Sequence, residues 1–425
     1  MLAQALCGVY TIVDGFFIGH SMGDAGIAAV TIGFPVAQFI LSIGTGIGVS
    51  GSVRFAILSA QKKSREEHEC FTSTGILMLL ASLVLTVVLY VLTEPIVTLL
   101  GATGQVHTMA AQYVRVIAVG TAFQLLSTGF VPFIRNMGGA SAAMIFMGLG
   151  FLMNIVLDWL LVWVMPFGMA GAAWATVIAQ GVTMAASVIF FIHRRYALRF
   201  AALGKMLSLW WQILKVSISP FGLSFSSQFT LIFMNRFLLA YGGERALAAF
   251  GCIDYILAII YLLLQGVGDG SQPLISRRFG ERDISGMRRM RGMAYAFGSA
   301  LTAVCMVTVF ILRGSIGRLF GASDAANADV IYYVPWFLIS MLPLCFERIT
   351  TSCLYAVEKT WLSYILVYGE PFGTLLMLLI LPHSLGINGV WASIPAAQCL
   401  CFIAAVIIKH FEDKSEEKLM TKRTA

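Results

Sequence analysis

Long apolar segments follow one another along almost the whole chain, with only short polar stretches between them. A helix needs about 20 mostly apolar residues to cross the hydrocarbon core of a bilayer, whereas a strand-built pore would show short segments of alternating polarity. The pattern therefore predicts an all-α polytopic membrane protein. Twelve such segments lie near residues 1–19, 28–59, 71–93, 108–132, 139–164, 169–193, 211–240, 246–272, 290–313, 331–355, 361–382 and 387–409.

Composition argues against the common soluble classes. Of the 425 residues, 59% are hydrophobic and only 12% are Asp, Glu, Lys or Arg, whereas about 25% are charged in a soluble domain. So little charge cannot coat a soluble particle, which excludes a cytosolic enzyme, a nucleic-acid-binding module and a disordered protein. None of the eight cysteines belongs to a CxxC pair, and we expect them to be small buried apolar residues.

The distribution of basic residues predicts the orientation. With an even number of spans, both termini and every second loop lie on one side. That side carries Lys62, Lys63, Arg65, Arg135, Arg194, Arg195, Arg199, Lys205, Arg277, Arg278, Arg282, Arg288, Arg289, Arg291, Lys359 and the tail from Lys409 to Arg423. The opposite loops carry only Arg245, Arg313 and Arg318. Because Lys and Arg accumulate in cytoplasmic loops, we expect both termini in the cytoplasm and the protein in the cytoplasmic membrane.

The start of the sequence is apolar and has no Lys or Arg before Arg54. A signal peptide would need a basic region and a cleavage site. We therefore expect a short cytoplasmic segment to precede Met1.

The two halves of the chain repeat each other in five ordered motif pairs, four of them at an offset of 220 residues and the last at 218. The pairs are Ile27-Ala-Ala-Val30 with Leu247-Ala-Ala-Phe250, Gly46-x-Gly48 with Gly266-x-Gly268, Gly101-Ala102 with Gly321-Ala322, Tyr113-Val114 with Tyr333-Val334, and Gly168-x-x-Gly171 plus Gln180 with Gly386-x-x-Gly389 plus Gln398. So constant an offset indicates a duplicated unit.

Six spans in each half give the halves the same orientation, with an axis along the membrane normal. We expect an N-terminal lobe at 1–193, a cytoplasmic linker at 194–209, a C-terminal lobe at 210–409 and a cytoplasmic tail at 410–425. Two such lobes favour a transporter that rocks between states over a channel.

Charged groups inside spans are costly and indicate function by default. Asp14 lies in the first span and Asp158 in the fifth, with Asn154 four residues earlier and therefore on the same helix face. Thr176 lies in the sixth span among small residues. Two carboxylates, an amide oxygen and a hydroxyl suit a hard cation such as sodium, and the carboxylates could instead carry a proton. The alternative is that both acids only join neighbouring helices.

Candidate substrate-cavity residues lie in the second half: Asp254, Glu347, Glu370 and Gln228. The three acids could attract a cationic substrate. The alternative is local pairing with Arg236 or Arg348.

Other chemistries lack their motifs. There is no GxxxxGK[ST] motif, so ATP does not drive the protein directly. The six His residues lack metal-ligand spacing, and no nucleophile–base pair lies within the spans. We therefore expect neither an enzyme nor a bound cofactor.

Several stretches carry a family resemblance. They are Val13-Asp14-Gly-Phe-Phe-Ile-Gly19, Pro132-Phe-Ile-Arg135-Asn-Met-Gly138, Asn154-Ile-Val-Leu-Asp158, Gly168-Met-Ala-Gly-Ala-Ala-Trp-Ala-Thr176-Val-Ile-Ala-Gln180 and Gln272-Pro273-Leu-Ile-Ser276 with Gly280. In these the chain resembles the multidrug and toxic compound extrusion (MATE) family, and within it the bacterial DinF-like branch.

The resemblance implies twelve helices in two six-helix lobes. It implies export coupled to inward flow of sodium or protons, with Asp14, Asn154, Asp158 and Thr176 as the cation site. The second half departs from the family. Glu370 stands where many members have a basic residue, and the seventh span lacks the acid of the NorM-like branch.

Together these features predict a secondary active multidrug efflux antiporter that works by alternating access. It would export amphipathic or cationic compounds in exchange for protons or sodium, as a monomer in the lipid bilayer, without ATP or nucleic acid. The alternatives are a flippase for a lipid-linked precursor and an exporter of a dedicated metabolite. A flippase predicts a strongly cationic cavity, and the intramembrane acids argue against it.

Overall fold

A computed structural model describes the backbone of residues 2–320 and 323–424, and the side chains of these residues except 2–12, 24, 244 and 415–424. The described chain forms helices joined by short turns and contains no strand. The helices are α1 (Leu2–Ala60), α2 (Ser64–Val91), α3 (Thr93–Leu99), α4 (Gly104–Val119), α5 (Thr121–Asn136), α6 (Ala140–Asp158), the π-helix η1 (Trp159–Val164), α7 (Gly168–His193), α8 (Leu203–Gly280), α9 (Ile284–Leu319), α10 (Asp324–Ala356), α11 (Thr360–Leu385) and α12 (Ile387–Thr424).

The predicted all-α polytopic fold is confirmed. Among the described residues, ten helices are long and apolar enough to span a membrane, and α4 with α5 makes an eleventh if the bent pair is one span. The first part of α1, which ends at a kink at Gly23, lies over the first predicted segment and is not among these spans. The sequence predicted one helix over 108–132, but the chain bends there by 56°. The break falls at Gly120, where a side chain would collide with Val177.

The internal repeat is also visible in the backbone conformation of the two halves. Four pairs of residues with positive φ share the offset of the motifs: Gly23 with Gly243, Lys62 with Arg282, Gly138 with Glu358, and Gly168 with Gly386. The first pair marks matching kinks, at φ 63° and 65°, inside α1 and α8. Such residues end or break helices, so the two halves share their turns as well as their motifs. The repeat motif Gly321-Ala322 lies outside the described residues.

Two compact units make up the chain: an N-unit of Leu2–Phe221 and a C-unit that begins at Gly222. The division falls inside α8. Residues 194–202, in the predicted linker, lie outside the helices, and α8 begins at Leu203. Helix α12 continues from the last predicted span into the predicted tail. The predicted lobe limits remain a prediction.

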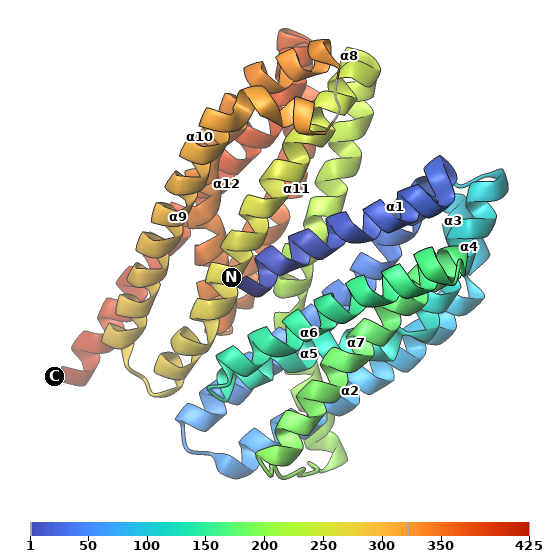
Figure 1. Cartoon of the computed structure of the whole chain (residues 1–425). Coiled ribbons are helices and arrows are strands. Elements are labelled where there is room, and N and C mark those ends of the chain that lie inside the picture. The colour runs from blue at the N-terminus through green and yellow to red at the C-terminus, as the bar shows by residue number, and fades with distance from the viewer. Residues whose placement is uncertain (1, 321–322, 425) are drawn as a thin grey trace. The chain divides into compact units, whose positions relative to one another are not determined.

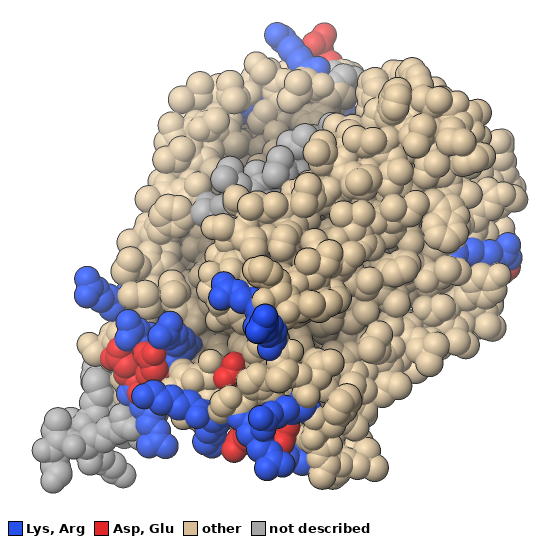
Figure 2. Space-filling view, turned by 60° about the horizontal axis from the view of Figure 1, so that its bottom comes forward, with Lys and Arg blue, Asp and Glu red and all other residues tan. Residues whose placement is uncertain are grey.

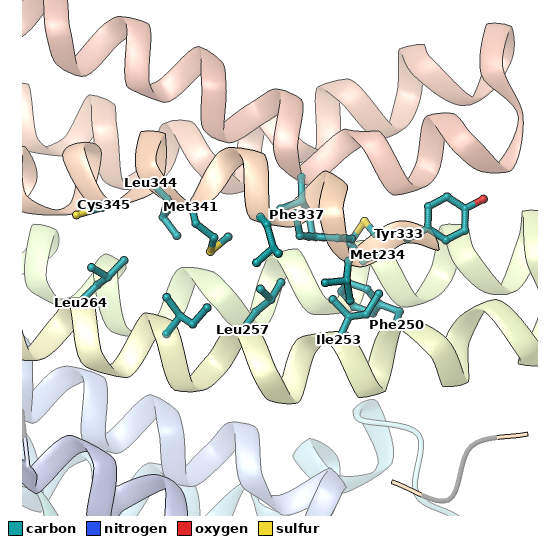
Figure 3. Packing of buried hydrophobic residues seen from close by; sticks show 14 of the residues in the cluster. Met234, Phe250, Ile253, Leu257, Leu264, Tyr333, Phe337, Met341, Leu344 and Cys345 are labelled. Carbon is teal, nitrogen blue, oxygen red and sulfur yellow. The ribbon is translucent and has the colours of Figure 1, made fainter. Parts of the chain in front are cut away.

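Apolar side chains fill the interior of each unit. In the C-unit, Met234, Phe250 and Leu257 of α8 point toward Phe337 and Met341 of α10, as Figure 3 shows. Helices α9, α10, α11 and α12 run alongside one another (Figure 1). Many large apolar side chains are also exposed, and most of the surface in Figure 2 carries no Lys, Arg, Asp or Glu. An apolar exterior is what contact with lipid requires.

Close helix contacts in the N-unit depend on glycine. A β-carbon added at Gly48 of α1 would lie 2.3 Å from the α-carbon of Gly129 in α5. We expect Gly48→Ala to lower the unfolding free energy by about 1–3 kcal/mol, because backbone must move to admit the methyl group. Gly75→Ala in α2 is the matched control, since nothing lies within 4 Å of the added atom. Thermal unfolding in detergent measures both, and equal midpoints would contradict the prediction.

Candidate functional site

Two acids from distant parts of the sequence meet inside the N-unit. Asp14 belongs to the first part of α1, and Asp158 is the last residue of α6. The side chain of Asp158 is fully buried, and the two carboxyl groups lie within hydrogen-bonding reach of each other. One oxygen of each, Oδ1, is buried without a hydrogen-bond partner in the described part of the chain. The pair therefore has acceptor oxygens to offer to a cation or a proton.

Asn154 and Thr176 join these acids, as the sequence predicts. In the amide orientation that satisfies both groups, Asn154 Nδ2 donates to Asp158 Oδ2 at 3.2 Å, and Asn154 Oδ1 accepts from the backbone N–H of Thr176 at 3.3 Å. The Thr176 hydroxyl donates to the carbonyl of Ala172 at 3.2 Å. Asn154 and the backbone of Thr176 are thus linked to the acid pair, whereas the Thr176 hydroxyl is bound within α7.

The backbone changes character directly after Asp158. Residues Trp159–Val164 form the π-helix η1, a form that occurs mostly as short segments, often at functional sites. Ser21 Oγ of α1 donates to the Val162 carbonyl at 3.2 Å. The first part of α1 and the end of the fifth span are therefore joined by a hydrogen bond as well as by the acid pair.

Tyr113 of α4 is a site residue that sequence reasoning missed. Its side chain is buried, and it is near enough to interact electrostatically with Asp14 and Asp158. The sequence identified it only as a repeat marker. Its counterpart Tyr333 instead donates to Asn388 Oδ1 at 2.7 Å. The sequence carries no signal that separates Tyr113 from Tyr333, because the two tyrosines differ only in what they contact in the folded chain.

This arrangement can take up positive charge. Two adjacent carboxylates in a low-dielectric interior resist being ionised together, and burying them without a partner is costly. Binding a proton or a monovalent cation removes that cost. Among the described residues no three His, Cys, Asp or Glu gather as a metal cluster, so a bound ion would also need the oxygens of Asn154 and Thr176.

The C-unit holds a second buried polar group, centred on Arg348 of α10. Its Nη2 donates to Glu370 Oε2 at 2.7 Å, and its Nε lies 3.7 Å from Glu347 Oε2. Gln398 Nε2 donates to the other oxygen of Glu370 at 3.0 Å and to the hydroxyl of Tyr261 at 3.2 Å. These contacts join α8, α10, α11 and α12. The predicted alternative of local pairing with Arg348 is what the structure has for both glutamates.

This group contains two carboxyl groups and one guanidinium group. Glu347 Oε1 accepts from the Thr351 hydroxyl at 2.8 Å, whereas its Oε2 is buried without a hydrogen bond in the described chain. Only 2% of the Glu347 side chain is exposed. One guanidinium group therefore lies beside two carboxyl groups, so the group can accept one more positive charge.

The other two candidates stay outside this group. Asp254 of α8 is partly buried and forms no ion pair with Arg236, which is exposed, within the described residues. Asp254 does act electrostatically on Tyr261. Gln228 is partly buried. The structure brings Glu347 and Glu370 together through Arg348, and it gives Asp254 and Gln228 no direct contact with them.

The chain matches known proteins over nearly all of its length. The family model MatE matches residues 1–160 and 220–376. Multidrug export protein MepA of Staphylococcus aureus (strain MRSA252) is 26% identical over 420 residues, covering 96% of this chain and 91% of MepA. MepA of Staphylococcus haemolyticus is 24% identical over 415 residues, with the same coverage.

Solved structures have the same fold. A multidrug resistance MATE family transporter of the MOP superfamily in an outward-facing conformation aligns with a TM-score of 0.92 at 22% identity, covering 98% of this chain and 94% of the other. A MOP superfamily transporter from Pyrococcus furiosus aligns with a TM-score of 0.91 at 21% identity, with the same coverage.

Proposed function

Since this chain belongs to the MatE family, whose model matches most of its length, we propose that it is a secondary active multidrug efflux antiporter. It exports amphipathic or cationic compounds in exchange for protons or sodium. The observation that carries the proposal is the acid pair Asp14–Asp158, whose Oδ1 atoms are buried without a partner in the described chain. The name of the MepA relatives, multidrug export protein, supports the export of several drugs.

In this mechanism Asp14, Asn154, Asp158 and Thr176 bind the coupling ion. Drug binds from the cytoplasm while the acids lack their ion, and ion binding from outside favours drug release. Inward movement of one positive charge supplies about 2.3 kcal/mol per 100 mV of membrane potential. The ion can drive the cycle only by binding the two conformations with different affinities.

A cationic drug would be attracted by the carboxylates of Glu347, Glu370 and Asp254. Gln228 would be a polar residue of the substrate cavity. The excess of one carboxylate around Arg348 supports this role. It argues against a lipid-linked pyrophosphate as substrate, because that cargo needs a cationic cavity. The basic turns, such as Lys62-Lys63 and Arg194-Arg195, lie on the cytoplasmic side, together with both termini. The protein works as a monomer in the lipid bilayer of the cytoplasmic membrane, without ATP, and is not an enzyme.

Everted membrane vesicles that contain the protein test the proposal. A fluorescent cationic drug is added outside, and a proton gradient or a sodium gradient is imposed in turn. We expect drug to accumulate under one gradient and to leave when an ionophore collapses it. Vesicles without the protein are the control. If neither gradient moves any drug of a broad panel, the multidrug proposal fails and a dedicated metabolite or lipid-linked substrate replaces it.

A further inference from the structure

The connection between the two units is attached to the N-unit far beyond its exposed loop. Glu69 at the start of α2 is only 3% exposed, and it pairs with Arg65 and with Lys205 of α8, the latter at 2.6 Å. The backbone N–H of Arg199 donates to Thr72 Oγ1 at 3.1 Å. Residues 199–205 are therefore fixed to α2 by a hydrogen bond and by an ion pair in which the carboxylate is buried and the Lys205 side chain is 48% exposed.

The first turns of α8 continue this attachment. Trp210 Nε1 donates to the Ser73 carbonyl at 2.8 Å. Ile213 is 1% exposed and belongs to an apolar cluster with Ile47, Leu77 and Leu125 of the N-unit. This part of α8 is thus packed into the N-unit core rather than serving as a free tether.

The attachment to the N-unit ends at Phe221. The Phe221 ring packs edge-on against Phe39 of α1, with centroids 5.9 Å apart. A β-carbon added at Gly46 would lie 2.9 Å from the Ser217 carbonyl and 3.1 Å from the β-carbon of Phe221. Helices α1 and α8 therefore touch backbone to backbone here, which explains why the repeat motif needs glycine at position 46.

One residue later the chain belongs to the C-unit. A β-carbon at Gly222 would meet Val367 and Tyr368 of α11 at 2.5 and 2.7 Å. The Leu223 carbonyl accepts from Arg348 Nη1 at 3.2 Å. Arg348, in the buried charged group of the C-unit, thus binds α8 two residues after the last residue of the N-unit.

Pro220 lies beside this boundary, one residue before Phe221. It has no backbone N–H, so the helix lacks one hydrogen bond at this position, and its ring crowds the preceding turn. Sharp helix bends usually occur at such prolines. We infer that residues 220–222, inside α8, form the hinge on which the two units move, and that residues 194–219 move with the N-unit. This inference rests on the alternating-access cycle proposed above.

Distances between spin labels test where the chain bends. Labels are placed by cysteine substitution at Leu79 of α2, at Gln212 before the hinge and at Ile232 after it, all exposed positions. A background without the eight native cysteines is used. Between sodium-free and sodium-containing buffer, and between acidic and neutral pH, the 79–212 distance stays constant, and the 79–232 distance changes in at least one of the two comparisons. A change of 79–212 comparable to that of 79–232 overturns the inference.

Transport gives a second test. Glu69→Cys with Lys205→Cys, joined by a short bifunctional thiol reagent, leaves the rate of drug transport unchanged, because both residues move together. Loss of transport on cross-linking overturns the hinge. Pro220→Ala slows transport several-fold, up to about tenfold, because the restored helix bond resists bending. Pro395→Ala in α12 is the control, and an equal effect there also counts against the hinge.

The two proposals fail in different ways. If drug is transported and the 79–212 distance changes, the antiporter proposal is supported and the hinge proposal is wrong. If the ion changes the 79–232 distance but no drug is transported, the antiporter proposal is wrong and the hinge proposal is supported.

Discussion

Asp158→Asn should abolish gradient-driven drug export while leaving the protein folded. The carboxamide is almost the same size as the carboxyl group, and it can still accept from the amide of Asn154, which lies 3.2 Å from Asp158 Oδ2. It cannot take up or release a proton, and it removes one negative charge from a sodium site. We expect uptake into everted vesicles to fall to the level of vesicles without protein, which is a loss of at least a hundredfold if ion coupling provides about 2.7 kcal/mol or more.

The same substitution elsewhere provides the control. Asp269→Asn in α8 removes a carboxylate from a helix of the C-unit, and we expect transport near that of the wild type. Equal amounts of protein in the membrane and equal unfolding midpoints are needed for the comparison. Robust uptake by Asp158→Asn would show that Asp158 only joins helices, and coupling would then pass to Glu347 and Glu370.

Sequence reasoning predicted the parts of the fold and site that depend on local spacing. Asn154 and Asp158 are four residues apart on one helix, so their common face follows from helix geometry. Asp14 lies on α1, far away in sequence, and was grouped with them because a carboxylate inside a span indicates function, a grouping that the family resemblance also implied. The length of the apolar segments likewise predicted the helices, because a span is set by bilayer thickness.

Features that depend on tertiary packing were not predicted. The π-helix after Asp158 has no sequence signature, because it is defined by a shift of backbone hydrogen bonds. Pairing of the acids with Arg348 was a predicted alternative, but the sequence did not show that Glu370, 22 residues away on α11, lies closer to Arg348 than its neighbour Glu347 does. Adjacent residues point about 100° apart on a helix, so sequence proximity is a poor guide to ion pairing.

Arg348→Met should strongly destabilise the C-unit. The guanidinium is bound to Glu370 at 2.7 Å and lies 3.7 Å from Glu347, and its own side chain is 14% exposed. Removing it leaves two carboxylates buried without their cation, and breaking a buried pair costs about 3–5 kcal/mol. Thermal unfolding in detergent, with the midpoint compared at one pH, measures the effect.

Arg245→Met is a control that distinguishes the effect of burial on stability from the effect of pairing geometry. Arg245 binds both oxygens of Asp329 at 2.6 Å, which is better geometry than Arg348 has with either glutamate. Its side chain is 61% exposed, however, and water screens exposed pairs so well that they contribute little to stability. If desolvation sets the cost, Arg348→Met lowers the midpoint strongly and Arg245→Met hardly at all. A comparable loss in both variants would mean that pairing geometry matters more than burial.

The decisive variant removes the acids as well. In Arg348→Met combined with Glu347→Gln and Glu370→Gln, no charge of the group remains buried, so most of the lost stability should return. The carboxamide oxygen at position 370 can still accept from Gln398 Nε2, which lies 3.0 Å from the native carboxylate oxygen. A triple variant as unstable as Arg348→Met would mean that the bond from Arg348 to the Leu223 carbonyl, rather than charge balance, holds the helices. Recovered stability without recovered transport would instead assign the excess carboxylate to function, because the fold would then not require it.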